Sequence, residues 1–231
     1  MRIASYNIRK AVGLDWRRDP GRVLGVLQEI NADVVVLQEA DRRVGQRAGV
    51  LSVDQLAQEL GYVFADVSVR PLSHGWHGNA ILYRPQGLMP DFTSHIYLPT
   101  LEPRGAVSVR FNTPDLEVVG VHLGLGRAMR RKQLIALDRA LKTATHPVLI
   151  AGDFNVWRHE ADIANMLGDQ FETITPGHSF HAAKPITALD RFVLKGAVGH
   201  VDSHVHRSAL ASRASDHLPI VIDLEFPEGK T

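Results

Sequence analysis

The chain has 231 residues, 45% of them hydrophobic and 22% charged, and its formal net charge is +1. This is the composition of an ordinary globular domain; no apolar stretch is long enough to cross a bilayer, and the near-neutral charge does not by itself indicate a nucleic-acid binder. The absence of cysteine excludes disulfides, thiolate metal sites and cysteine nucleophiles, so any bound metal must take oxygen or nitrogen ligands.

Strand-like apolar runs alternate with a few helical segments along the whole chain. We predict ten strands, near residues 2–8, 33–39, 62–69, 78–84, 105–112, 116–123, 147–153, 188–194, 199–206 and 218–225. The chain opens directly into the first of these strands rather than into a signal peptide, so we expect a cytoplasmic location.

Four helices are predicted from their end signals and apolar spacing. The first begins at Asp19-Pro20, and the second follows Ser52, which with Gln55 forms a capping box, and ends at Gly61. The third is predicted over Arg127 to Thr145 and the fourth near residues 159–168. No repeat or linker interrupts the pattern, so residues 1–231 are predicted to form one α/β domain. Its two mixed sheets pack face to face with helices outside.

Acids and amides stand at the ends of apolar strands, where burial of a charge is costly unless the charge is paired or bound to a metal. Glu39 follows Val34-Val35-Val36-Leu37-Gln38, and Asp153 and Asn155 follow Val148-Leu149-Ile150-Ala151-Gly152. Ligand sites in open α/β sheets lie at strand ends. A helix cap or surface acid would explain Glu39 alone, and an Asx turn would explain Asp153 and Asn155.

A histidine precedes the last strand, in Ser215-Asp216-His217. An imidazole beside a phosphate needs a carboxylate on its other nitrogen, and Asp190 is the best candidate for that partner. Oxygen ligands and an imidazole from separated segments together indicate a hard divalent cation and a phosphate ester.

Three further polar side chains interrupt apolar strands: Asn7, Asn79 and His122. Asparagine is disfavoured in strands, so both amides are expected to have polar partners. A single strand histidine is more often a hydrogen-bonded core residue than a catalyst, but here it is the third polar group in such a position.

In this order, the segments resemble the endonuclease/exonuclease/phosphatase superfamily, which includes deoxyribonucleases, abasic-site endonucleases, neutral sphingomyelinases and inositol-polyphosphate 5-phosphatases. The resemblance spans nearly the whole chain. Its motifs are Tyr6-Asn7, Leu37-Gln38-Glu39, Gly78-Asn79-Ala80, Val121-His122-Leu123, Gly152-Asp153-Phe154-Asn155, Leu189-Asp190 and Ser215-Asp216-His217. Arg9 and Ala40-Asp41 depart from the abasic-site endonuclease pattern, which disfavours that activity.

The resemblance implies a four-layer α/β sandwich and a Mg²⁺-dependent phosphoesterase, with Mn²⁺ as an alternative metal. The metal ligands that it implies are Glu39, Asn7 and Asp216. Asp153 would align or activate the attacking water, Asn155 would bind the phosphate, and His217, held by Asp190, would stabilise the transition state or transfer a proton. His122 would be a general acid or phosphate contact, and Asn79 would support the site.

Cations near these segments are candidates for substrate binding. Arg127 and Arg130, with Arg131 and Lys132, crowd the start of the third helix, where positive charge opposes the helix dipole. A phosphorylated ligand would compensate for this charge, and pairing with surface acids would do so equally well. Arg104, in Glu102-Pro103-Arg104-Gly105, is a further candidate for phosphate contact, although a simple hairpin turn also explains it.

The sequence therefore predicts a metal-dependent hydrolase of phosphodiester bonds that uses direct water attack. DNA or RNA is favoured as substrate because of the basic helix start, followed by a phospholipid or sphingomyelin-like diester and then a phosphomonoester. No obligate protein partner is expected. A calcineurin-type metallophosphoesterase is disfavoured because its Gly-Asn-His-Glu/Asp and early Asp-x-His motifs are missing. A catalytically silent binding module with the same fold is the alternative of a different class.

Overall fold

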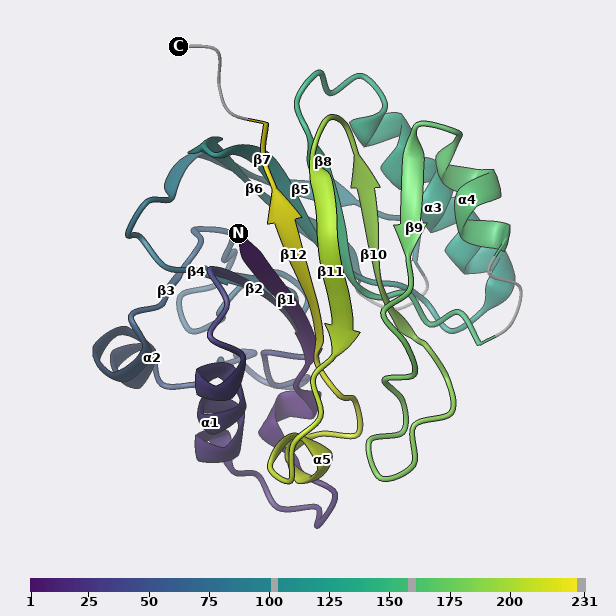
Figure 1. Ribbon diagram of the computed structural model, residues 1–231. Helices are drawn as coiled ribbons and strands as arrows, with labels where there is room; N and C mark the ends of the chain where they lie inside the picture. The colour runs from purple at the N-terminus through teal and green to yellow at the C-terminus, as the bar shows by residue number, and fades with distance from the viewer. Residues whose placement is uncertain (101–103, 158–160, 228–231) are drawn as a thin grey trace.

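Two parallel strand pairs, each joined by a crossover helix, form the centre of the computed structural model, which describes residues 1–100, 104–157 and 161–227 (Figure 1). In the first pair, α1 (Pro20–Ile30) connects β1 (Arg2–Asn7) to β2 (Val34–Gln38). In the second, α3 (Arg127–Leu141) connects β7 (Asp115–His122) to β8 (Val148–Asp153).

Antiparallel strands extend each pair into a six-stranded sheet within the described residues. The first sheet has the order β11-β12-β1-β2-β4-β3, and the second has the order β5-β6-β7-β8-β10-β9. The added strands are β3 (Val63–Phe64), β4 (Ala80–Tyr83), β5 (Met89–Tyr97), β6 (Gly105–Thr113), β9 (Phe171–Ile174), β10 (Asp190–Lys195), β11 (Gly199–Val205) and β12 (Ile220–Glu225). The remaining helices are η1 (Arg9–Ala11), α2 (Val53–Leu60), α4 (Ala161–Leu167) and α5 (Ala211–Ala214).

Three apolar layers hold the sheets and helices together. Along β2, Val34 and Val36 face the second sheet, whereas Val35 and Leu37 face α1 and α2. Both faces of this strand are buried, which is why its sequence is continuously apolar. A third cluster joins the outer face of the second sheet to α3 and α4. The result is the four-layer α/β sandwich that the sequence predicted (Figure 1).

The two sheets lie close together at Gly120, a residue without a side chain. A Cβ atom on Gly120 of β7 would lie 2.8 Å from Cγ1 of Val36 on β2. Any larger residue at position 120 would push the sheets apart. The relative position of the two central strand pairs therefore depends on this glycine.

All ten predicted strands and all four predicted helices are present, with shifted ends. β5 and β9 were not predicted, and neither were η1 and α5; the third helix ends at Leu141 rather than at Thr145. Ser52 caps α2 as expected, with its hydroxyl accepting from the Gln55 amide at 3.3 Å. Asp19 is the N-cap residue of α1 and Pro20 its first residue, as predicted, but the Asp19 carboxylate makes no capping hydrogen bond and pairs with Arg22 at 3.1 Å. In the described part of the chain, no helix combines the length and apolarity that a bilayer span requires.

A buried lysine closes the end of α3. Lys195, the last residue of β10, donates from Nζ to the carbonyl oxygens of Leu141 and Lys142 at 2.8 Å and of Ala144 at 2.9 Å. These carbonyls lie at the negative end of the helix dipole, where a cation is favourable. The lysine therefore ties the second sheet to the helix that covers it.

We expect Lys195→Met to lower the free energy of unfolding by about 2–4 kcal/mol, because three carbonyls lose a charged donor in a buried place. Urea denaturation followed by circular dichroism measures this change. Lys184→Met, at an exposed position, is the matched control and should change stability by less than about 0.5 kcal/mol. Equal stabilities of the two variants would contradict the proposed anchoring role.

Candidate active site

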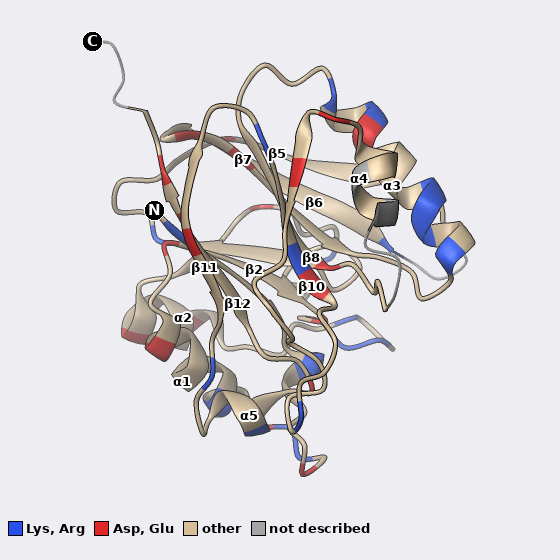
Figure 2. Ribbon diagram, turned by 45° about the vertical axis from the view of Figure 1, so that its right-hand side comes forward, with Lys and Arg blue, Asp and Glu red and all other residues tan. Residues whose placement is uncertain are grey.

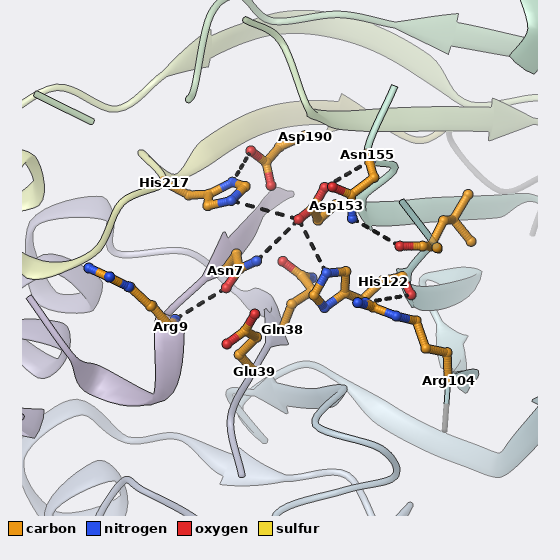
Figure 3. A network of polar contacts seen from close by, with 12 residues as sticks. Asn7, Arg9, Gln38, Glu39, Arg104, His122, Asp153, Asn155, Asp190 and His217 are labelled. Carbon is orange, nitrogen blue, oxygen red and sulfur yellow. Dashed lines mark hydrogen bonds and ion pairs between the residues drawn. The ribbon is translucent and has the colours of Figure 1, made fainter. Parts of the chain in front are cut away.

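Strand ends from both sheets meet at one edge of the sandwich. Asn7 ends β1, His122 ends β7 and Asp153 ends β8, while Asp190 begins β10. Glu39 follows β2, and His217 lies shortly before β12. Figure 3 shows these side chains around a shared centre, as their positions at strand ends led us to expect. Residues more than 200 positions apart in the chain thus contribute to one site.

The Asp153 carboxylate is the hub of this cluster and is 2% exposed. Its Oδ2 atom lies 3.2 Å from Asn7 Nδ2, 3.4 Å from His122 Nε2 and 3.7 Å from His217 Nε2. Its Oδ1 atom accepts from the backbone amide of Asn155 at 2.9 Å. Burial and the nearby Asp190 raise the pKa of Asp153 to about 6, although His217 opposes the shift. A carboxylate of this pKa is well suited to accept a proton near neutral pH.

Gly152 allows β8 to approach β7 closely just before Asp153. Its φ is 153°, and a Cβ atom there would lie 1.9 Å from the carbonyl oxygen of Val121. Only glycine permits this approach of β8 to β7 immediately before Asp153. The next polar residue, Asn155, has a φ of 53° and donates from Nδ2 to the carbonyl oxygen of Leu123 at 2.9 Å.

His217 and Asp190 form the pair that the sequence predicted. His217 Nδ1 lies 2.8 Å from Asp190 Oδ2, and both side chains are buried. Burial alone would lower the pKa of His217, but the carboxylates of Asp190 and Asp153 outweigh it and raise the pKa to about 9. The imidazole is therefore protonated at neutral pH, with Nδ1 directed to Asp190 and Nε2 to Asp153.

Two neighbours of this pair were not predicted. The Ser179 hydroxyl donates to Asp190 Oδ2 at 2.5 Å, and the Phe180 ring lies 4.9 Å from the His217 ring between centroids. Both residues lie in the segment between β9 and β10, whose sequence carries no motif that indicates this contact. They fix the orientation of the imidazole.

The three predicted metal ligands lie on the side of the site formed by the first sheet, and two of them contact cations. Glu39 pairs with Lys10, and Asp216 Oδ2 lies 3.4 Å from Arg9 Nε. Asn7 Oδ1 accepts from the backbone amide of Arg9 at 3.1 Å. The sequence held a signal for these cations, since Arg9 and Lys10 follow Asn7 almost directly, but the prediction did not use it.

The donor set suits a hard divalent cation. In the described residues, no three His, Asp or Glu side chains are arranged as a metal cluster. Mg²⁺ does not require such a cluster, because it is usually held by one or two carboxylates together with water and substrate phosphate. The Glu39 carboxylate and the Asn7 amide oxygen provide donors of this kind, and Asp216 adds a second carboxylate nearby.

His122 lines the opposite wall of the site. Burial lowers the pKa of His122 well below its usual value, and the charges of Arg104 and His217 add to the effect. Arg104 donates from Nη1 to the His122 carbonyl oxygen at 3.4 Å, and Asn79 donates from Nδ2 to the carbonyl oxygen of Gly105 at 2.8 Å. His122 is therefore a neutral imidazole, in contrast to His217 on the other side of Asp153.

Of the residues predicted to bind substrate, some line the cavity beside the site and others do not. Arg104 and Asn79 line the cavity beside the site, as does His122. Arg130 does not line it: it is buried and donates to the carbonyl oxygens of Gly124, at 3.2 Å, and Leu125 in the loop before α3. The expectation that Arg130 is free for substrate is wrong, because its guanidinium stabilises this loop. Arg127 is exposed and lies outside the cavity lining, and Glu102 and Pro103 lie outside the described residues.

Comparison with known proteins agrees with this geometry. The model of the Endonuclease/Exonuclease/phosphatase family matches residues 4–217. The chain is 28% identical over 223 residues to the uncharacterized protein YbhP of Escherichia coli (strain K12), an alignment that covers 87% of this chain and 86% of that protein.

Two solved structures illustrate the shared fold. D. rerio TDP2 complexed with single strand DNA product has a TM-score of 0.74 at 20% identity, covering 97% of this chain and 98% of that chain. The mannosyl-6-phosphatase of Bacteroides thetaiotaomicron VPI-5482 has a TM-score of 0.75 at 17% identity, covering 98% and 100% respectively. At these identities the likeness establishes a common fold.

Proposed function

Because the chain belongs to the endonuclease/exonuclease/phosphatase family, we propose that its site hydrolyses phosphodiester bonds by direct water attack in the presence of Mg²⁺ or Mn²⁺. Members of the family are hydrolases of phosphoester bonds and generally use divalent metal ions. The observation that carries the proposal is the buried Asp153 carboxylate, surrounded by nitrogen atoms of Asn7, His122 and His217. An ordinary structural acid needs no such convergence.

The metal would be held by Glu39 and Asn7, with Asp216 close by. A divalent cation at such a site polarises the phosphoryl group and offsets the charge that develops on its oxygens. The rest of the chemistry belongs to the side chains around Asp153. The contacts and charge of each of these side chains suggest a distinct task for it.

Asp153 orients the attacking water and accepts its proton, since its pKa of about 6 matches this task near neutral pH. His217 carries a positive charge, which Asp190 maintains, and donates from Nε2 to an oxygen of the transition state. Neutral His122 lies on the other side of Asp153 and contacts the phosphate or the leaving group. Asn155 orients the phosphate at the end of β8.

Asp153→Asn should lower kcat for bis-p-nitrophenyl phosphate by about 10²–10⁴-fold, because the water loses its proton acceptor. Release of p-nitrophenolate measures the rate, and circular dichroism verifies the fold. Asp202→Asn, on exposed β11, is the matched control and should retain the wild-type rate. A folded Asp153→Asn variant with near-normal turnover would overturn the proposed mechanism.

Glu39→Gln should raise the Mg²⁺ concentration for half-maximal activity at least about tenfold, since one charged metal donor becomes neutral. EDTA should abolish wild-type activity, and added Mg²⁺ or Mn²⁺ should restore it. Glu59→Gln, on the exposed face of α2, is the control and should leave the titration unchanged. An unshifted midpoint in Glu39→Gln would remove this residue from the metal site.

A nucleic-acid strand is the first substrate candidate, supported by the many cations on the connecting segments at this end of the molecule (Figure 2). They include Arg42 and Arg43, which line the cavity at the site, and Arg70, which lines the adjoining cavity. Phosphate backbones are bound mainly through such side chains. The helix start that first favoured this substrate contributes less than expected, because Arg130 is committed to its own loop.

A phospholipid diester is the second candidate, and the distribution of exposed apolar side chains favours it. Of the thirteen large hydrophobic side chains exposed among the described residues, eight lie on segments at the end of the sandwich that carries the site: Trp16, Val44, Val69, Leu72, Tyr97, Leu125, Trp157 and Ile186. Apolar tips surrounded by cations suit insertion into an anionic lipid surface. Aliphatic tips add nothing to base stacking.

The two candidates predict opposite results with purified protein and Mg²⁺. A nuclease cleaves supercoiled plasmid or single-stranded RNA and leaves vesicles of cardiolipin or sphingomyelin intact, whereas a lipid diesterase does the reverse. In the second case, Val44→Ser with Leu72→Ser should slow vesicle hydrolysis at least about tenfold, because two membrane-inserting groups are lost. The same double variant should hydrolyse bis-p-nitrophenyl phosphate at the wild-type rate.

A further inference from the structure

The cavity at the site extends beyond the catalytic side chains into a part lined by arginines. Its volume is about 230 Å³, and Glu39, Asn79 and His122 are among the residues that line it. The same lining includes Arg42, Arg43, Arg47 and His77, which we call the arginine pocket. None of these four residues has a task in the proposed hydrolysis.

The segment that carries the three arginines is held in place at its base. Asp41 is buried; its Oδ2 accepts from the Ser73 hydroxyl at 2.6 Å and its Oδ1 from the backbone amide of His74 at 2.8 Å. Asp41 also forms a β-bridge with Gly49, and the Arg42 amide donates to the Ala48 carbonyl at 3.0 Å. The arginines therefore project from a closed, anchored turn, which lowers the entropy cost of binding a ligand.

Positive charge is in excess around this cavity. Its lining holds five cations, Lys10, Arg42, Arg43, Arg47 and Arg104, and two carboxylates, Glu39 and Asp41. Glu39 pairs with Lys10 and so offsets one of these five cations, whereas Asp41 accepts from Ser73 and His74. The three arginines of the turn remain in excess. Arg47 Nη1 lies 3.4 Å from His77 Nδ1, so this arginine contacts a neutral partner rather than an acid.

The charge excess acts on the site itself. The charges of Arg104 and Arg43 are among the causes that, after burial, lower the pKa of His122. Arg43 and His122 also line the same cavity. Cations that line one cavity repel one another, and an anion bound between them offsets the repulsion.

A phosphate group is the anion that this geometry fits. Guanidinium groups bind phosphate through paired hydrogen bonds, and several of them on one turn favour a group with more than one negative charge. The cavity is smaller than the usual ligand site of about 300–1,000 Å³, so its arginine part accommodates a compact group. A second cavity of about 230 Å³ shares Arg47 and His77 and leads on to Arg70 and Trp76.

We propose that Arg42, Arg43, Arg47 and His77 form a subsite for a second phosphate of the substrate, next to the phosphate that is hydrolysed. The proposal rests on the proposed function for the position of the first phosphate. The second phosphate comes either from a small bisphosphorylated compound or from the next linkage of a nucleic-acid strand. In both cases the subsite selects substrates that carry a second phosphate near the one that is hydrolysed.

The test compares binding of thymidine 5′-monophosphate and thymidine 3′,5′-bisphosphate by isothermal titration calorimetry. EDTA is present, because it prevents metal-dependent turnover and leaves the arginines unchanged. Wild-type protein should bind the bisphosphate at least about tenfold more tightly, as one additional charge-assisted contact provides. Arg42→Ala with Arg43→Ala should reduce this preference to less than about twofold.

Arg17→Ala with Arg18→Ala is the matched control, since it also removes two adjacent arginines, both exposed on the segment between η1 and α1 and absent from the cavity lining. It should leave the preference for the bisphosphate unchanged. Equal losses in both double variants would mean that general attraction, rather than a subsite, holds the second phosphate. No preference in the wild-type protein would also overturn the proposal.

A ten-nucleotide oligothymidylate identifies the source of the second phosphate. If its affinity falls with Arg42→Ala and Arg43→Ala as that of the bisphosphate does, the subsite binds a strand; if only the bisphosphate is affected, it binds a small compound. Binding with this preference but no Mg²⁺-dependent hydrolysis would defeat the proposed function alone. Hydrolysis without the preference would defeat the subsite alone.

Discussion

Burial of the Asp153 carboxylate is the constraint around which the structure is organised. A charged group with 2% exposure is tolerable only if its partners compensate for the lost hydration. Those partners come from β1, β7 and the segment before β12, and therefore from both sheets. The apolar layer between the sheets thus has a second task beyond stability, because it sets the distances from Asp153 to Asn7 and His217. The close contact of Gly120 with Val36 lies in that layer.

The two sheets divide the chemistry between them. Around β1, β2 and β12 lie the oxygen donors proposed for the metal, Asn7, Glu39 and Asp216, and also His217. Around β7, β8 and β10 lie the groups proposed to handle water, proton and phosphate, namely Asp153, Asn155, His122 and Asp190. Each half contains a parallel pair whose carboxyl ends point to the same edge, so the arrangement follows from repeating one strand-helix-strand unit and facing the copies together. The opposite pKa shifts of the two imidazoles follow from this division as well. His217 has the carboxylate of Asp190 on its far nitrogen, whereas His122 is buried and near Arg104 and Arg43.

Sequence patterns predicted the buried parts of this arrangement well and its surface parts poorly. β2 and β8 are apolar on both faces and end in polar residues, so both the strands and their chemistry could be predicted. β5 was missed because it is an edge strand with exposed residues and a proline, in which no clear alternation remains. The contact of Ser179 with Asp190 and the donation of Lys195 to the end of α3 depend on tertiary distances that no local motif encodes. Arg130 shows the same limit: its position in the sequence suggests a free cation, and only the fold reveals the carbonyls that it serves.

Substrate choice must therefore lie in the loops rather than in the strands. Relatives with the same fold at 17–20% identity include a TDP2 bound to single strand DNA product and a mannosyl-6-phosphatase, so the sandwich does not dictate the substrate. The proposed reaction groups of this chain are at or beside strand ends, where packing fixes them. The connecting segments are free of that constraint. They carry the arginines of the arginine pocket and the exposed apolar side chains such as Trp16 and Leu72. A change in those segments would alter which phosphoester enters without moving Asp153. For the same reason, loss of activity on one substrate through a loop variant is evidence about recognition, whereas loss on all substrates through a strand-end variant is evidence about the reaction.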